Sequence, residues 1–291
     1  MTMETLLAIQ TAPADMMLAA PILIVLVAFA AEYVDSTLGM GYGTTLTPLL
    51  LLFGFTPIQV VPAILLSELL SGLFAGAAHH VAGNVNFRPK DANGKGVIAN
   101  LKALGYVETF RRTVPMDLKI ASLIAACSTV GTITAVFLAV KLNAFYLKLY
   151  IGTMVLLVGL FILYSRKKNW PFSWRRMIGW SLVASFNKGV SGGGYGPIVT
   201  GGQVLSGVRG KNAVAITSLA EGLTCVVGFA TYLCFRRIND WGLFPYLCAG
   251  ALMSVPLSAW TVKKVPTGKL TLAIGILTVC LGALTLWKVL F

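Results

Sequence analysis

The sequence predicts an all-α polytopic membrane protein, and three observations point to this fold class. Apolar residue types make up 57% of the 291 residues and charged types 11%, against about 45–50% and about 25% in ordinary soluble domains. The mean hydropathy is +0.81. Long apolar runs recur along the chain, and such runs form helices in lipid because every backbone polar group then finds a partner within its own segment. This composition argues against a soluble enzyme, a disordered chain and a disulfide-rich secreted module.

Ten apolar runs are expected to form the membrane segments. They cover residues 17–34, 43–54, 57–82, 117–140, 144–165, 175–187, 197–207, 211–235, 243–262 and 268–290. Six of them approach or exceed the ~20 residues that span the hydrocarbon layer, and 17–34 and 175–187 are of marginal length. The runs 43–54 and 197–207 are too short to span alone, and each follows a glycine-rich break.

An internal repeat relates the two breaks. A shift of 153 residues superimposes 13 identical residues within positions 34–86, among them Gly39, Gly41, Tyr42, Gly43 and Glu68 on Gly192, Gly194, Tyr195, Gly196 and Glu221. Farther along, Gly152 and Gly159 match Gly275 and Gly282 at an offset of 123. We therefore expect an N-terminal repeat, 1–165, and a C-terminal repeat, 166–291, with a cytoplasmic insertion near 87–116 in the first. Duplicated halves with glycine breaks at matching positions are typical of secondary transporters, which bind substrate at those breaks.

The basic residues predict the topology. They gather in the loops 83–116 and 165–176, which the positive-inside rule places in the cytoplasm. With five membrane segments in each half the two repeats are inverted, and the basic residues near 209–211 and 263–269 are also cytoplasmic. An eight-span model makes 43–54 and 197–207 re-entrant and moves these two groups outside. The ten-segment model fits the charges slightly better, and the choice stays open.

The formal net charge of +13 is assigned mainly to this topology and not to nucleic-acid binding. Membrane lipid is an expected partner, and no nucleic acid is expected. The sequence contains no ATP-binding P-loop, and its five cysteines lie in apolar runs without ligand spacing. No cofactor or metal is expected.

The two glycine breaks are the candidate substrate site. Glycine lowers the stability of a helix, so a glycine-rich segment tends to unwind. Unwound backbone at membrane depth is tolerated only inside protein or beside a water-filled cavity. A helix that starts there directs free N–H groups at the break and attracts anions. The predicted substrate-binding residues are Ser36, Thr37, Gly39, Gly41 and Tyr42 in the first break, and Asn187, Lys188, Ser191, Gly192, Gly193, Gly194 and Tyr195 in the second. An ion pair between Asp35 and Lys188 is also expected.

Three carboxylates, Asp35, Glu68 and Glu221, are the predicted coupling residues. Ionisable side chains inside a membrane are costly and mark ion or proton pathways. The formal charges sum to −3 when Glu32, Asp35, Glu68, Glu221 and Lys188 are all ionised. A net negative charge of this kind repels an anion. We therefore expect Glu68 or Glu221 to be protonated when substrate binds. The alternative is that both glutamates form structural hydrogen bonds.

The paired breaks resemble the sulfite exporter TauE/SafE family, also called the TSUP permeases. The resemblance rests on the Asp35–Gly43 run DSTLGMGYG and the Ser191–Pro197 run SGGGYGP, and it covers about 20 to 290. It implies a multi-pass permease of the bacterial inner membrane that moves sulfite, sulfonates or related organic anions. The 87–116 insertion is longer than the family leads us to expect.

The resulting functional hypothesis is a secondary transporter of a small sulfur-containing anion such as sulfite or an organosulfonate, coupled to protons or the membrane potential. Export is the expected direction, and the exact substrate, coupling ion and oligomeric state stay open. One alternative is an anion channel on the same fold. Another is an intramembrane serine protease, because Gly189-Val190-Ser191-Gly192 fits the GxSG pattern of rhomboid proteases. That chemistry needs a histidine near Ser191, and the two histidines, His79 and His80, close another helix. We expect a transporter and not an enzyme.

Overall fold

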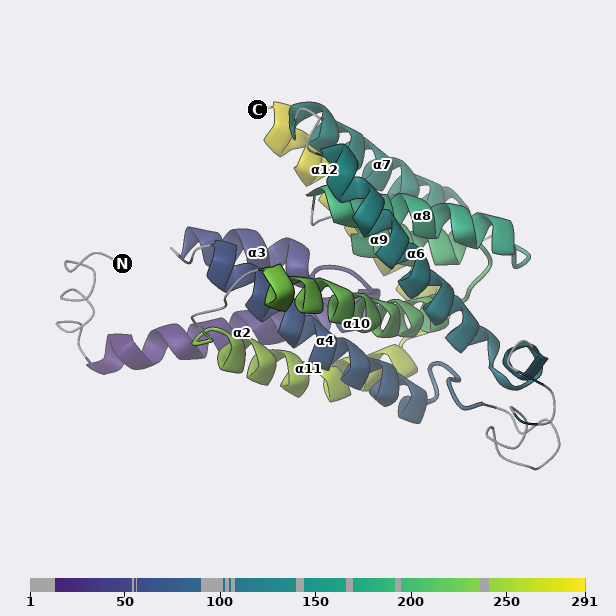
Figure 1. The fold of residues 1–291 in the computed structure, drawn as a ribbon, viewed down its shortest axis with the longest axis horizontal. Helices are drawn as coiled ribbons and strands as arrows, with labels where there is room; N and C mark the ends of the chain where they lie inside the picture. The colour runs from purple at the N-terminus through teal and green to yellow at the C-terminus, as the bar shows by residue number, and fades with distance from the viewer. Residues whose placement is uncertain are drawn as a thin grey trace.

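The computed structural model describes residues 14–53, 55, 57–89, 102, 105, 108–139, 144–165, 170–191, 195–235 and 241–290, and within them all regular secondary structure is helical. The helices are α2 (Ala14–Leu38), α3 (Tyr42–Leu52), α4 (Pro57–Ala82), α6 (Met116–Ala139), α7 (Ala144–Ser165), α8 (Trp174–Ser191), α9 (Tyr195–Leu205), α10 (Gly210–Phe235), α11 (Phe244–Lys264) and α12 (Thr267–Leu290). Figure 1 shows α2, α4, α10 and α11 in the lower part of the molecule and α7, α8 and α12 in the upper part, while α6 runs diagonally from the upper part toward the lower right.

The expected helical segments are confirmed, including the two short ones. Helices α3 and α9 have 11 residues each. The chain leaves α2 through Gly39 and Gly41, whose φ angles of 76° and 136° suit glycine and strain other residues. In the part of the chain that the structure describes, four helices are long and apolar enough to cross a membrane, at Pro21–Leu38, Gln59–Ala82, Gly210–Ala230 and Thr267–Lys288. The described residues therefore form an all-helical structure with several candidate membrane spans.

Helices α7 and α12 pack together through the glycines that the repeat brought into register. A Cβ atom on Gly152 would lie 2.9 Å from Leu286, and one on Gly275 would lie 2.6 Å from Leu163. The two contacts are images of each other, because 152 and 163 become 275 and 286 at the same offset of 123. Low residue numbers of α7 meet high numbers of α12, so these two corresponding helices run antiparallel.

Helices α4 and α10, which correspond at the offset of 153, also run antiparallel. Gly72 lies against Gly222, and a Cβ atom on Gly72 would be 2.9 Å from the Cα of Gly222. Nearer the start of α4, Leu65 meets Gly228 near the end of α10. The absence of side chains at the crossing lets the two backbones approach closely, as small residues do between membrane helices.

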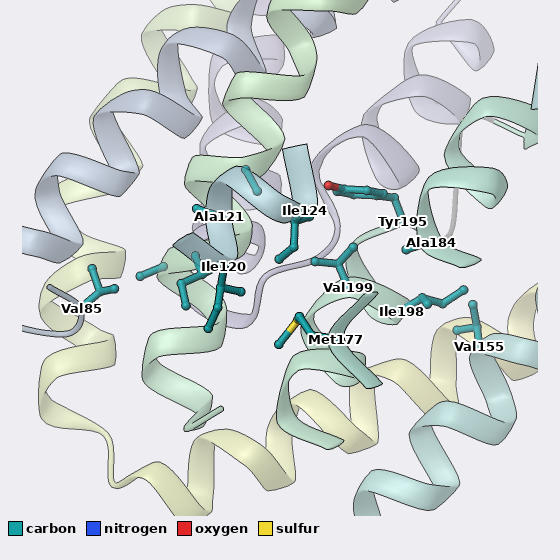
Figure 2. Packing of buried hydrophobic residues seen from close by; sticks show 13 residues of the cluster. Val85, Ile120, Ala121, Ile124, Val155, Met177, Ala184, Tyr195, Ile198 and Val199 are labelled. Atoms are coloured by element: carbon teal, nitrogen blue, oxygen red, sulfur yellow. The ribbon is translucent and has the colours of Figure 1, made fainter. Parts of the chain in front are cut away.

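The short helix α9 lies inside the protein. Ten of its eleven residues are buried, and Tyr195, Ile198 and Val199 belong to a large apolar cluster. Figure 2 shows these side chains in the middle of the cluster, with Ile120, Ala121 and Ile124 of α6 on one side and Val155 of α7 on the other. A helix buried on all sides is tolerated here because its neighbours, and not lipid or water, surround it.

The segments that carry the basic loops meet at one end of the molecule. The Asn84 side chain after α4 donates to the Ala259 carbonyl near the end of α11, with a distance of 2.8 Å. Asn212 at the start of α10 donates to Asp117 at the start of α6, at 3.0 Å. Two further bonds join Lys211 to the Lys263 carbonyl at 2.8 Å and Arg176 to the Leu205 carbonyl at 3.0 Å. The ends of α4, α9 and α11 therefore lie beside the starts of α6, α8 and α10.

Candidate functional site

A small cavity lies between α2, α4 and α10 and is lined mainly by carboxylates. Its lining consists of Glu32, Asp35, Glu68, Ser71, Gly72, Ser218 and Glu221. The space holds about one water molecule. The three predicted coupling residues, Asp35, Glu68 and Glu221, therefore share one cavity, and Glu32 joins them.

Three of the four carboxylates, Glu32, Asp35 and Glu68, are buried and accept hydrogen bonds. Glu32 is 2% exposed, and Asp35 and Glu68 are each 8% exposed. Ser71 donates to Glu32 at 3.1 Å, and the thiol of Cys225 donates to Glu68 at 3.3 Å. These partners hold the carboxylates in place without neutralising their charge.

Glycines bring the helices around the cavity close together. The Gly72–Gly222 contact sets α4 directly against α10. Gly43, in the first turn of α3, lies beside Glu68, since a Cβ atom there would be 3.0 Å from Oε1. The N-terminus of α3 therefore points its positive end at the carboxylates, and Asp35 accepts a hydrogen bond from the backbone N–H of Tyr42 at 3.3 Å. Acidic groups at a helix N-terminus are stabilised by its dipole.

The two breaks lie against each other next to this cavity. Gly196, in the first turn of α9, contacts the Gly39–Met40 backbone, and a Cβ atom there would be 2.8 Å from the Gly39 carbonyl oxygen. The hydroxyl of Thr200 donates to the same carbonyl at 2.8 Å. The first break thus supplies the acceptor, and α9, which follows the second break, supplies the donor.

The predicted binding residues of the first break have different surroundings. The Ser36 hydroxyl already accepts a hydrogen bond from Ser258 at 2.8 Å. The Thr37 hydroxyl is buried and has no hydrogen-bond partner among the described residues. The Tyr42 hydroxyl bonds to Ser67 at 2.8 Å, as that of Tyr195 bonds to Ser128 at 2.8 Å. Both tyrosines are therefore anchored in the protein interior.

The second break is described only in part. Asn187, Lys188 and Ser191 lie in the last turns of α8, where the structure describes the backbone alone. Gly192, Gly193 and Gly194 lie outside the described residues. The expected Asp35–Lys188 pair stays a prediction.

Glu32, Ser71 and Ser218 line the cavity although the sequence did not assign them to the site. A spacing signal links them to the predicted residues, because each helix contributes two polar residues three positions apart: Glu32 with Asp35, Glu68 with Ser71, and Ser218 with Glu221. Residues at this spacing share one helix face. Among the described residues, no group of three or more His, Cys, Asp or Glu side chains is arranged to hold a metal ion.

Comparisons with known proteins agree with the resemblance seen in the sequence. The family model "Sulfite exporter TauE/SafE" matches residues 24–90 and 89–285. The "Probable membrane transporter protein YtnM" of Bacillus subtilis (strain 168) is 26% identical over 269 residues, which cover 88% of this chain and 79% of the relative. No solved structure matches the chain. The chain therefore belongs to the sulfite exporter TauE/SafE family and is a membrane transporter.

Proposed function

We propose that the protein is a proton-coupled secondary transporter that moves a small sulfur-containing anion, such as sulfite or an organosulfonate, across the bacterial inner membrane. The observation that carries the proposal is the cavity, where acidic residues of α2, α4 and α10 gather beside the contact between the two breaks. The family membership supports the class of substrate, and the cavity supports protons as the coupling ion.

The cavity favours protonation of at least one carboxylate. Four acidic side chains line a space of about one water molecule, and like charges at such short range repel strongly when little water screens them. Removal from water further favours the neutral acid. Glu68 and Glu221 occupy equivalent positions in the two repeats, and we assign the transported proton to this pair.

The anion is assigned to the α9 side of the two breaks. The N-terminus of α3 already has a carboxylate partner, since Asp35 accepts from the N–H of Tyr42. The residue that corresponds to Asp35 in the second repeat is Lys188, so a positive charge stands in the sequence where the first repeat has a negative one. The Thr37 hydroxyl is a further donor candidate, because it is buried without a hydrogen-bond partner in the described part of the chain, and buried polar groups ordinarily have one.

We further propose ten membrane segments in two inverted repeats. The antiparallel pairs α4–α10 and α7–α12 support inversion, because corresponding helices then cross the membrane in opposite directions. The hydrogen bonds Asn84–Ala259 and Asn212–Asp117 join segments that the eight-span model places on opposite sides of the membrane. The ten-segment model puts these segments on one side, together with the loops 83–116 and 165–176.

Cysteine accessibility tests this topology. Single cysteines at Lys263 and Arg236, in a background without the five native cysteines, are expected to label from opposite sides of the membrane. Lys263 should label from the cytoplasm, as should a cysteine in the loop 165–176 as a reference. Labelling of both positions from the same side would contradict the inverted arrangement.

Substitution of Lys188 tests the anion site. Lys188→Ala should raise the Kd for the anion at least about tenfold, because a hydrogen bond to a charged group contributes roughly 1.5–3 kcal/mol. Lys188→Arg, which keeps the charge, serves as the control and should retain more of the affinity. Calorimetry on purified protein measures the effect, and an unchanged Kd for a folded Lys188→Ala protein removes Lys188 from the site.

A competition panel tests the substrate class. Sulfite, sulfoacetate, taurine and acetate are offered to purified protein, and the thermal midpoint reports binding. We expect stabilisation by a sulfur oxyanion and little effect of acetate. Equal stabilisation by acetate would shift the substrate class to carboxylates.

The protease alternative is not supported by the histidine environment. Both ring nitrogens of His79 have partners, the Ser36 carbonyl at 2.9 Å and the Asn84 amide at 3.0 Å. A catalytic histidine must instead accept the proton of the nucleophilic serine. Concentrative flux distinguishes the transporter from the channel alternative, because a channel only equalises the anion concentrations on the two sides of the membrane.

A further inference from the structure

We propose that His79 is a positioning residue of the transport site, a neutral histidine that fastens the end of α2 to α11 and releases it when it is protonated. We call the group Ser36, His79, Asn84, Ser258 and Ala259 the His79 latch. The inference rests on the proposed transport function and concerns the conformational step that accompanies it.

The hydrogen bonds of the latch fix the protonation state of His79. The ring is fully buried, and its Nε2 lies 2.9 Å from the Ser36 carbonyl oxygen. A carbonyl only accepts, so Nε2 carries a hydrogen. The Asn84 amide nitrogen lies 2.8 Å from the Ala259 carbonyl oxygen and 3.0 Å from Nδ1 of His79. The Ala259 carbonyl identifies the Asn84 atom as the donor nitrogen, and Nδ1 must accept its second hydrogen.

Protonation of His79 breaks this arrangement. A hydrogen on Nδ1 would point at the Asn84 amide hydrogens, and two donors cannot bond to each other. Asn84 can offer its oxygen to the imidazolium only by turning its amide, and the bond to the Ala259 carbonyl is then lost. When His79 gains a second proton, Asn84 therefore loses its hydrogen bond to Ala259 of α11 and keeps only a hydrogen bond to His79 of α4.

The latch acts on the break that forms the candidate site. Ser36 directly follows Asp35, which lines the carboxylate cavity, and precedes the buried Thr37 hydroxyl. The Ser258 hydroxyl of α11 also donates to the Ser36 hydroxyl at 2.8 Å. Loss of the Asn84–Ala259 bond thus weakens the attachment of α11 at the point where α2 ends.

The latch belongs to one half of the molecule. The residues equivalent to Ser36, His79 and Asn84 in the second repeat are Gly189, Tyr232 and Arg237, which cannot form the same set of bonds. Among the side chains that the structure describes, the titratable or charged ones on the segments packed around His79 are Glu32, Tyr33 and Asp35 on α2, Glu68 and His80 on α4, Arg88 after α4, and Tyr246, Cys248, Lys263 and Lys264 on α11. A pH effect of the latch must therefore be separated from that of the cavity carboxylates.

The test compares His79→Gln and His79→Ala with His80→Gln as the matched control, in the full-length protein. Glutamine can still donate to the Ser36 carbonyl but does not titrate. His79→Gln should keep transport at neutral pH and lose only the part of the acid-induced change in rate that the latch contributes, whereas the pH dependence of the cavity carboxylates should remain. His79→Ala should slow transport about tenfold at every pH, as expected for loss of a hydrogen-bond anchor. His80→Gln should keep the wild-type pH profile.

A direct measurement keeps the inference testable if a variant does not fold. The chain has two histidines, so nitrogen-15 NMR of the histidine-labelled wild type, assigned with His80→Gln, reads the state of His79. The expected spectrum at neutral pH has Nε2 protonated and Nδ1 bare, and acidification should add the second proton together with a fall in the thermal midpoint. A bare Nε2 at neutral pH, or a His79→Gln pH profile equal to that of the wild type, would overturn the inference. Failure of wild-type protein to move any anion would refute the proposed function instead, and would leave the NMR result to decide the latch.

Discussion

Replacing the glutamate that carries the transported proton by glutamine is expected to abolish gradient-driven transport, while anion binding persists. In the proposed mechanism this glutamate is either Glu68 or Glu221. Glutamine mimics the protonated acid in shape and charge, so the binding-competent state becomes permanent and cannot release a proton. The wild type should bind the anion more tightly as the pH falls, because protonation removes a negative charge from the cavity. In the coupling variant this pH dependence should be flat.

Calorimetry from mildly acidic to mildly alkaline pH measures this effect for the wild type, Glu68→Gln and Glu221→Gln. A sulfonate that stays ionised throughout serves as ligand, so that its own protonation does not contribute. Ser218→Ala, which changes the cavity lining without altering its charge, is the control and should keep the wild-type slope. If all three proteins share one pH dependence, neither glutamate carries the proton, and both have structural roles.

Gly72→Ala is expected to destabilise the protein strongly, although it adds only one methyl group. The new Cβ atom would lie 2.7 Å from the Ser218 carbonyl oxygen and 2.9 Å from the Gly222 backbone, and neither backbone can move without separating α4 from α10. Overpacking of this kind costs about 1–3 kcal/mol. Because the same crossing forms one wall of the carboxylate cavity, transport should fall as well.

The matched control is Gly179→Ala in α8, where a Cβ atom would meet nothing within 4 Å. Alanine favours a helix over glycine by roughly 0.5–1 kcal/mol, so this variant should melt at or above the wild-type temperature in the same detergent. Equal melting temperatures for Gly72→Ala and Gly179→Ala would mean that α4 and α10 are farther apart than the Gly72–Gly222 contact requires.

Much of the fold could be predicted from the sequence, because a membrane leaves few choices. Apolar runs must be helical, and the glycines at 39 and 41 mark where α2 has to end. The repeat placed Glu68 and Glu221 at equivalent positions, and antiparallel packing of α4 on α10 then brings them to one cavity. That outcome follows from a pattern in the chain and from the geometry of paired helices.

The remaining features depend on packing that no local pattern encodes. From the sequence, Glu32 is predicted only to be a charged residue within the membrane. Its place in the cavity depends on which face of α2 meets α4 and α10. The contact of Asn84 with Ala259 joins residues 175 positions apart, and neither lies in a recognisable motif. His79 at the end of an apolar run resembles an interfacial residue, whereas the structure buries it against Ser36 because α11 covers that end of α4.

The most direct test of proton-coupled anion transport is concentrative flux in proteoliposomes that contain the purified protein. A pH gradient is imposed at zero membrane potential, and a labelled sulfonate or sulfite is followed together with internal pH. Proton coupling predicts that the anion accumulates against its own concentration gradient, that protons move with it, and that a protonophore abolishes the accumulation. Flux that only equalises the anion concentrations and does not respond to the pH gradient would contradict proton coupling and identify an anion channel.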